Sequence, residues 1–458
     1  MPFVVNAVEM SARMMPSTEI YQASKPFLGR LMSPNYAIRM SAIRDFDQTV
    51  RSGDFPALPT RPAMGNHYHD NYSWGPGYPA LAAFFSKVNG LVVTGQVNHY
   101  SLAGAGEFRQ ACGSLLLPCT VGFEVRALER HPVYVRDNSG SSIDLSKTVI
   151  NSPGNPGEIY EMFHGVVGDS SRFIEMAHRP KLARYQGVVG LINDSLASHN
   201  AGFYIPYGEV VSTANEANVL DRHVTDALFN YLFDDAKGDF NGIASRMSDW
   251  WGPLTVAEAD KLAATSTSDE YAASMVLRNG LRDRLLKTGM PAYIQPSYEE
   301  CPGADALNPY AVEDNAWLTL AFLKPELAFL DDYMEVSGQR GFTAISAMQN
   351  RNPMSEIDIV KEHANIFEFL YINGMDVNNW TQTWIDDPHS YDPYLIATTF
   401  MLVGHEAALR SGFDGMHQLK GRYNFADMCR ILERIGRESD PSTGKISPEQ
   451  YAQTLKLD

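Results

Sequence analysis

The chain has 458 residues, of which 44% are hydrophobic and 20% are charged, and this composition is that of a globular protein with one large core and an added lobe, or with two domains. The formal net charge is −17, and the sequence contains no Lys/Arg run. This balance argues against binding to a nucleic-acid backbone or to an anionic membrane surface, because both need a concentrated basic face.

The first part of the chain contains an alternation of strands and helices. Residues 1–60 are weakly patterned, and we expect them to form an N-terminal extension. From residue 61 the pattern changes: the apolar run Leu91-Val-Val-Thr94 is followed by helical spacing over residues 105–112 and by a second apolar run at residues 115–121. A strand, a helix and a strand in this order are typical of a parallel α/β unit, whose functional residues lie at the carboxyl ends of the strands.

The rest of the chain divides into three segments. Residues 169–289 are predicted to form a helical lobe, because apolar residues recur at i, i+4, i+7 and i+8 from Leu220. Apolar runs and helical stretches alternate again over residues 290–440, and residues 441–458 form a polar tail. We therefore predict a barrel-like α/β core, built from residues 61–168 and 290–440 and interrupted by the helical lobe.

Histidines and one acidic residue come at the ends of the first three predicted strands. His67 and His69 form a His-x-His pair, and on an extended segment both imidazoles point the same way. Such a pair suits one divalent metal, although two histidines packed on one strand face would explain it equally well. His99 and Glu124 each come at the end of an apolar run. Three strand ends that offer these side chains in order favour a metal site.

These strings resemble the motifs of the PHP (polymerase and histidinol phosphatase) metallohydrolases. Residues 67–75 match the family's His-x-His-Ser-x-Tyr-Ser-Asp-Gly except at two places. Val97-Asn-His-Tyr-Ser-Leu-Ala-Gly104 is similar to Thr-Asp-His-Asn-Thr-Leu-Ala-Gly, and Gly122-Phe-Glu124 matches Gly-x-Glu. The resemblance implies an α/β fold with a distorted (β/α)7-type barrel and a helical insertion lobe. It also implies one or two divalent ions, zinc, manganese or iron, with His67 and His69 among the ligands.

Weaker resemblances extend along the chain. The family's strand that ends in His is similar to the segment before His164, and its Arg-Pro-His-Ile-Ala helix start is similar to the segment around His223. These residues would be ligands or substrate contacts, and histidines held by backbone carbonyls are the alternative. The family's closing Asp-x-His would be Asp387-Pro-His389, and a simple turn is the alternative there.

The chain also departs from the family pattern. Trp74 stands where the first motif has an Asp ligand, Asn98 replaces the Asp of the second motif, and the second half has no Ala-His-Pro segment. We therefore do not expect a full multinuclear centre. One or two ions held by His67, His69 and Glu124, with His164, Asp387 or His389, remain the expectation.

The expected reaction is hydrolysis of a phosphoester in a small phosphorylated metabolite. A divalent metal lowers the pKa of bound water, which supplies hydroxide near neutral pH, and it neutralises charge on a phosphoryl oxygen. His99 or His223 would protonate the leaving oxygen. Arg222 or Arg351 would contact the phosphate, and Trp74 would form an apolar or stacking wall. Metal-dependent amide or C–O hydrolysis, a lyase step, and an inactive metal- or ligand-binding barrel are the alternatives.

The four cysteines indicate a reducing compartment. None forms a C-x-x-C pair, and in a chain of this length they are typical of free thiols. The first residues lack the basic region and apolar core of a signal peptide, and no stretch approaches ~20 uncharged apolar residues. We expect a cytoplasmic enzyme with a small-molecule substrate and without nucleic-acid or membrane partners. Its oligomeric state is left open.

Overall fold

The structure is a computed structural model, and it describes all residues except 1–6, 74, 130, 152–155, 168–170, 215–218, 289–316, 323–326, 348–351, 375, 381, 383–387, 414 and 457–458. The described part divides into two compact units. Residues 176–288 form a helical unit, and residues 7–175 and 317–456 form a second unit, which we call the barrel unit.

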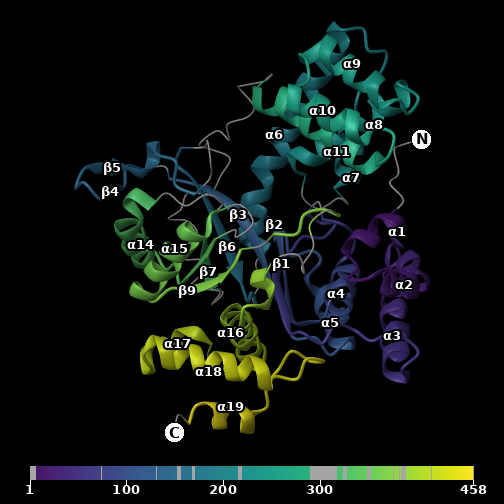
Figure 1. The fold of residues 1–458 in the computed structure, drawn as a ribbon. Coiled ribbons are helices and arrows are strands. Elements are labelled where there is room, and N and C mark those ends of the chain that lie inside the picture. Colours follow the sequence, from purple (N-terminus) through teal and green to yellow (C-terminus); the bar gives the residue numbers. More distant parts are fainter. Residues whose placement is uncertain are drawn as a thin grey trace. The chain divides into compact units, whose positions relative to one another are not determined.

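A seven-stranded sheet forms the centre of the barrel unit, in the order β1-β2-β3-β6-β7-β8-β9. Its strands are β1 (Ala63–Tyr68), β2 (Leu91–His99), β3 (Cys119–Leu128), β6 (Glu158–His164), β7 (Trp317–Phe322), β8 (Ala344–Ala347) and β9 (Leu370–Asn373). Val377, just after β9, pairs in parallel with Tyr68 of β1, so the two ends of the sheet meet (Figure 1). The predicted fold class, an α/β barrel of seven strands, is confirmed.

One strand of the barrel runs against the others. The pairs β1–β2, β2–β3, β7–β8 and β8–β9 are parallel, whereas β6 is antiparallel to both β3 and β7. The sequence predicted parallel units, which holds for six strands but not for β6. The carboxyl end of β6 therefore lies beside the amino-terminal half of β3, where His164 pairs with Gly122.

Helices cover the barrel strands. Those of the barrel unit are α1 (Ala7–Met10), η1 (Ser11–Met14), α2 (Thr18–Leu31), α3 (Tyr36–Ser52), α4 (Pro79–Val88), α5 (Ala105–Ser114), η2 (Leu145–Lys147), η4 (Leu327–Phe329), α14 (Leu330–Gln339), α15 (Met354–Ile366), η5 (Pro388–Tyr391), α16 (Pro393–Arg410), α17 (Met416–Arg422), α18 (Phe425–Glu438) and α19 (Pro448–Thr454). A short hairpin of β4 (Tyr134–Arg136) and β5 (Ser142–Asp144) forms a separate sheet.

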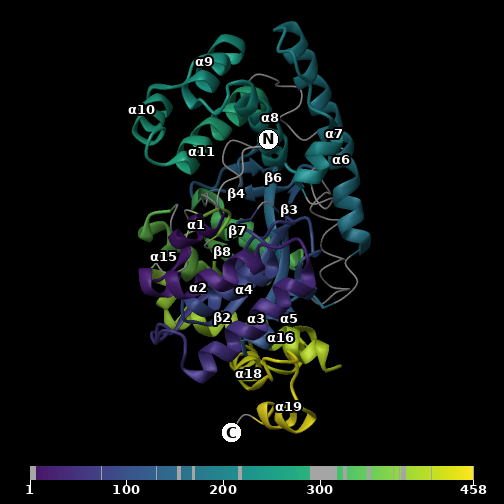
Figure 2. The ribbon, with the colours of Figure 1, turned by 90° about the vertical axis from the view of Figure 1, so that its right-hand side faces the viewer.

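The N-terminal helices belong to the core of the barrel unit. Phe27 and Phe46 pack edge to face, and Phe46 lies 4.6 Å between ring centroids from Phe84 of α4. All three side chains are buried. Because aromatic side chains bury large apolar areas, this cluster attaches α2 and α3 to α4, the helix that follows β1. In both ribbon views α2 and α3 run beside α4 (Figure 2).

The helical unit has its own apolar core. It contains most of α6 (Ser171–Ser198), then α7 (Tyr207–Thr213), α8 (Asp221–Asp235), α9 (Phe240–Trp251), α10 (Val256–Thr265), α11 (Glu270–Leu281) and the π-helix η3 (Arg282–Thr288). Leu196, Leu228 and Leu277 are fully buried in its apolar core. The apolar spacing from Leu220 corresponds to the buried face of α8.

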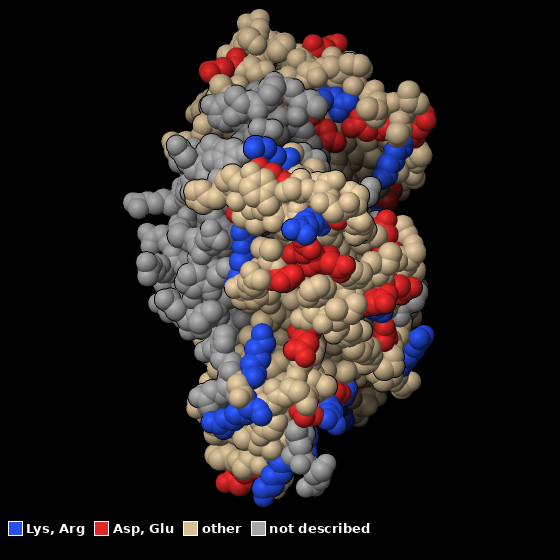
Figure 3. Space-filling view, turned by 90° about the vertical axis from the view of Figure 1, so that its left-hand side faces the viewer, with Lys and Arg blue, Asp and Glu red and all other residues tan. Residues whose placement is uncertain are grey.

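Two observations on the described residues concern binding to nucleic acids and to membranes. In Figure 3, acidic and basic side chains are interspersed on the face that is shown. No helix of the described residues combines the length and apolarity needed to cross a membrane.

Candidate metal centre

His67 and His69 lie at the carboxyl end of β1 and point to the same side of the strand. Both are buried, and their Nε2 atoms are 3.1 Å apart. The backbone at this point is fixed by Val377, whose N–H donates to His67 O at 3.0 Å and whose carbonyl accepts from His69 N–H at 3.1 Å. The closure of the barrel thus sets the direction of both imidazoles.

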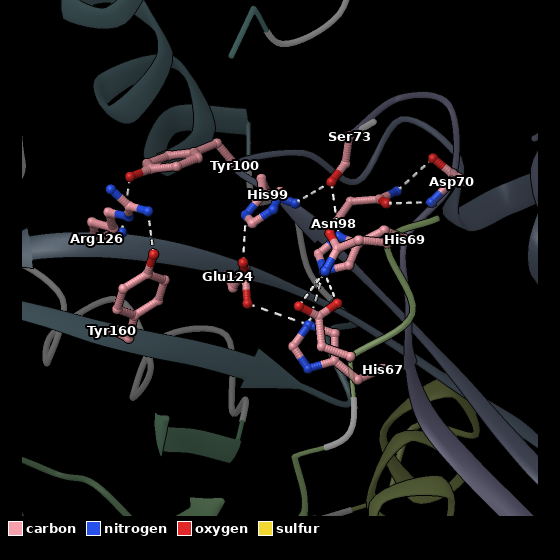
Figure 4. Close-up of polar contacts among 12 residues, drawn as sticks. His67, His69, Asp70, Ser73, Asn98, His99, Tyr100, Glu124, Arg126 and Tyr160 are labelled. Atoms are coloured by element: carbon pink, nitrogen blue, oxygen red, sulfur yellow. Dashed lines mark hydrogen bonds and ion pairs between the residues drawn. The ribbon is translucent and has the colours of Figure 1, made fainter. Parts of the chain in front are cut away.

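The neighbouring strands bring a third imidazole and a carboxylate to the same place. His99 ends β2 and pairs with Glu124 of β3. Glu124 Oε2 lies 3.2 Å from His67 Nε2, and Glu124 Oε1 makes a short contact with His99 Nδ1. The rings of His69 and His99 stack at 4.4 Å between centroids. Figure 4 shows these side chains converging from three adjacent strands.

Asp376, which the sequence analysis did not single out, completes the group. It follows β9, and its Oδ1 lies 3.0 Å from His69 Nε2. Two overlapping sets have ligand atoms within 4.8 Å of one another: one set is His67, His69 and Asp376, and the other is His69, His99 and Glu124.

A second layer of polar groups orients the imidazoles. Ser73 Oγ lies 2.9 Å from His69 Nδ1 and accepts the His99 backbone N–H at 2.8 Å. If His69 is protonated at Nδ1, it donates to this hydroxyl and its Nε2 lone pair faces Asp376. Metal-ligating histidines usually donate their other ring N–H in this way.

Asp70 fixes the loop that carries Ser73. Its carboxylate accepts from the Tyr72 N–H at 2.8 Å, from Asn98 Nδ2 at 2.9 Å and from Gln96 Nε2. Burial raises the pKa of Asp70 to about 7, against the lowering effect of the hydrogen bonds from Tyr72 and Asn98. A Cβ at Gly104 would clash with Asp70 Oδ2, so the Gly of the Leu-Ala-Gly string leaves room for this carboxylate.

The two carboxylates of the group are ionised. Burial alone would raise the pKa of Glu124, but the neighbouring His99 and His67 lower it well below its usual range. His69 and His67 likewise outweigh burial at Asp376 and lower the pKa of this side chain. Metal ligation requires neutral imidazoles, and in that state the two carboxylates would give the group a net charge of −2, which is complementary to one divalent cation.

These residues fit a divalent metal. Two nitrogens bound 2.0–2.1 Å from one tetrahedral ion are about 3.3 Å apart, close to the separation of the His67 and His69 Nε2 atoms, 3.1 Å. Imidazole nitrogens together with carboxylate oxygens suit zinc, manganese or iron. The donor set alone does not distinguish among these metals.

His164 is a further candidate ligand on the inner side of the barrel. It is fully buried, and neither ring nitrogen has a hydrogen-bond partner among the described residues. Burial, together with the neighbouring His67, lowers its pKa to about 3, while Glu124 acts in the opposite direction. A neutral, unpartnered imidazole this deep in a protein is costly unless a ligand satisfies it.

Other predicted site residues are not part of the candidate groups of the described residues. His389 is half-buried in η5 and belongs to neither candidate group of the described residues. Arg222 and His223 belong to α8 of the helical unit, where His223 Nδ1 accepts the Leu220 N–H at 2.9 Å and caps the helix. Trp74, Arg351 and Asp387 lie outside the described residues.

The solved structures that are similar to this chain include the following two. One, described as a metal-dependent phosphoesterase from Bifidobacterium adolescentis, is 14% identical with a TM-score of 0.47 and covers 71% of this chain and 91% of its own. The other, an amidohydrolase from Chromobacterium violaceum with bound sulfate and no metal, is 11% identical with a TM-score of 0.45 and covers 70% of this chain and 88% of its own. No family model and no curated protein matches the chain. At these values the similarity carries no functional argument, and the proposal below rests on the site.

Proposed function

We propose that this chain is a metal-dependent hydrolase that cleaves a phosphoester of a small phosphorylated metabolite. The observation that carries the proposal is the convergence of three imidazoles and two ionised carboxylates, from β1, β2, β3 and the segment after β9, on one buried point. Placement in the PHP family is part of the proposal and rests on the motif strings.

In this proposal His67, His69, Glu124 and Asp376 hold one or two divalent ions, with His164 as a further ligand. A bound divalent ion supplies an activated water near neutral pH and neutralises negative charge on a phosphoryl oxygen.

The chain's own residues position the reaction. Ser73 fixes the tautomer and orientation of His69, and Glu124 holds His99. The side chain of His99 is 18% exposed, more than that of His67, His69, Glu124 or Asp376. A substrate that approaches from solvent meets His99 first, which suits a role in moving a proton to the leaving oxygen. Contacts of Arg222, His223, Arg351 or Trp74 with substrate stay predictions.

The test is metal-dependent turnover. Protein supplied with Zn²⁺ or Mn²⁺ should hydrolyse 4-nitrophenyl phosphate, and His67→Ala/His69→Ala should lose at least about 100-fold in kcat/KM, because it removes two ligands. Turnover of amides or carboxylic esters instead would favour the non-phosphatase alternative. Stoichiometric metal without turnover of any of these substrates would leave a metal-binding barrel.

A further inference from the structure

Arg126 lies on the same strand and the same face as Glu124. The two are two residues apart on β3, so their side chains point to one side of the sheet and their positions differ by about 7 Å along the strand. Arg126 is on the carboxyl-terminal side of Glu124. Figure 4 shows it beside His99 and Glu124, between Tyr100 and Tyr160.

The guanidinium of Arg126 is held by buried partners and still reaches solvent. Its Nη2 donates to Tyr160 Oη, and its central carbon lies 4.7 Å from the centroid of the Tyr160 ring. Its Nε is 3.5 Å from Glu158 Oε1, longer than the usual range of about 2.7–3.2 Å for an N–H···O hydrogen bond. The side chain of Arg126 is 38% exposed, whereas that of Glu158 is 2% exposed.

Tyr100 connects Arg126 to the metal ligands. Its N–H donates to Glu124 O at 2.8 Å, and its hydroxyl accepts the Arg126 backbone N–H at 2.9 Å. Tyr100 has a φ of 51°, a left-handed conformation that is unfavourable for a bulky residue. Strain of this kind persists where surrounding contacts enforce it, often at functional sites. These contacts fix the backbone after His99 to the stretch of β3 that carries Arg126.

We propose that Arg126 binds a second oxyanion of the substrate, a phosphate or a carboxylate separate from the bond that is cleaved. This rests on the proposed hydrolase function, because the metal ligands would hold the reacting group. A guanidinium presents a rigid fork of donors that matches an oxyanion. The spacing along β3 predicts an anion a short carbon chain away from the reacting group. Substrates with one anionic group would use the centre without this contact.

Binding to protein supplied with Mn²⁺ tests the proposal by titration calorimetry. The probes are the phosphonates propane-1,3-diylbisphosphonate and 4-phosphonobutanoate, which the proposed hydrolase cannot cleave, compared with propylphosphonate and butylphosphonate, which lack the second anion. Wild type should bind at least one of the two probes that carry a second anion about 10- to 100-fold more tightly than the matching probe that lacks it. The probe that shows the difference identifies phosphate or carboxylate as the second anion.

Two variants should change the preference for the second anion in opposite directions. Arg126→Gln should remove the preference, and it should reduce the affinity for propylphosphonate and butylphosphonate much less than the affinity for the probes with two anions. Glu158→Gln should strengthen the preference, because it removes a charge that neutralises the guanidinium. Arg44→Gln, at an exposed position of α3, makes the same change in net charge and should bind as wild type does. If Arg126→Gln is not folded by circular dichroism, Arg126→Lys, which keeps the charge and loses the fork, should show a reduced preference.

The outcomes separate this inference from the proposed function. Equal affinities for the paired probes in wild type, or equal losses for both members of a pair in Arg126→Gln, would overturn the role of Arg126 even if hydrolysis is found. A preference that Arg126→Gln abolishes, in a protein without turnover, would uphold the anion site and reject the hydrolase.

Discussion

Asp376 contributes one of the two negative charges of the candidate metal centre, and its carboxylate lies next to His69. Asp376→Asn keeps the shape of the side chain and removes its negative charge. We expect metal affinity to fall at least about tenfold, because a charged ligand is replaced by a neutral one. His389→Ala is the matched comparison, since His389 lies outside both candidate groups. Competition with a chromogenic chelator measures both affinities; a loss in His389→Ala without a loss in Asp376→Asn would restore the closing Asp-x-His assignment.

The sequence identified four of the five converging side chains for a physical reason. His67 and His69 form a His-x-His pair, His99 and Glu124 follow apolar runs, and the carboxyl ends of parallel strands meet at one edge of a sheet. Asp376 also follows an apolar run, Leu370-Tyr-Ile-Asn373, so the same rule could have found it. The segment around Asp376 lacks a histidine, whereas Asp387-Pro-His389 contains one. The resemblance to the family's Asp-x-His therefore predicted ligands in the later segment. The contact between Val377 and β1, which brings Asp376 to the site, is a pairing between distant segments that local pattern does not reveal.

Glu161 is a buried carboxyl group on the face of β6 opposite to His164. It is fully buried, and neither oxygen has a hydrogen-bond partner among the described residues. Burial, together with Glu129, raises the pKa of Glu161 well above its ordinary value, although Arg340 acts in the opposite direction. The folded protein therefore keeps this proton at a pH where the unfolded chain, with a pKa of about 4.3, has released it.

The expected consequence is a loss of stability as pH rises above about 4.3. Glu161→Gln cannot ionise, so its melting temperature should fall less than that of wild type between pH 5 and pH 8, and it should exceed wild type at pH 8. Glu433→Gln, at the exposed Arg437 pair of α18, serves as a control and should follow wild type. Parallel pH profiles for Glu161→Gln and wild type would show that Glu161 ionises in the folded state.

At the scale of elements, α16 is attached to the barrel through one buried carboxylate. Glu406 is 2% exposed; its Oε1 lies 2.7 Å from Arg109 Nε of α5, and its Oε2 accepts the Val121 N–H of β3 at 3.1 Å. Its contacts thus join α16 to α5 and to the start of β3, the strand that carries Glu124 further along.

Glu406→Ala should destabilise the protein by about 3–5 kcal/mol, because it leaves Arg109 Nε and the Val121 N–H without the carboxylate that accepts from them. Chemical denaturation measures the change. Arg434→Ala, which removes an exposed pair with Glu438, should cost less than about 1 kcal/mol. A loss at Glu406 no larger than at Arg434 would mean that the attachment of α16 depends on its apolar contacts alone.

The direction of β6 relative to its neighbouring strands could not be predicted from the sequence. The strand that ends at His164 is buried on both faces, and this pattern is compatible with either direction relative to β3. The hydrogen-bond pattern in the structure decides it. As a result His164 lies opposite Gly122, two positions from the level of Glu124, and still faces the interior. The helices over residues 169–289, in contrast, follow from apolar spacing that is local in the sequence.

At the scale of the whole molecule, metal binding should protect one part of the chain. A ligand that binds only the folded state stabilises it by about 2.7 kcal/mol at a concentration of 100 Kd. Hydrogen exchange measured with and without Mn²⁺ should show slower exchange in peptides that contain His67–His69, His99 and Asp376. Peptides from α9 and α10 of the helical unit, which contribute no residue to the candidate groups, should exchange at unchanged rates. Equal slowing in both sets of peptides would indicate metal binding away from the proposed centre.

The most direct test of the account is the metal content of protein purified without chelator. Wild type should carry about one or more equivalents of zinc, manganese or iron, and His67→Ala/His69→Ala should lose them. His363→Ala/His389→Ala, which removes two histidines outside the candidate groups, should keep the wild-type content. A metal-free wild type, together with a His67→Ala/His69→Ala variant that binds added metal equally well, would contradict the central claim that these strand ends form a metal centre.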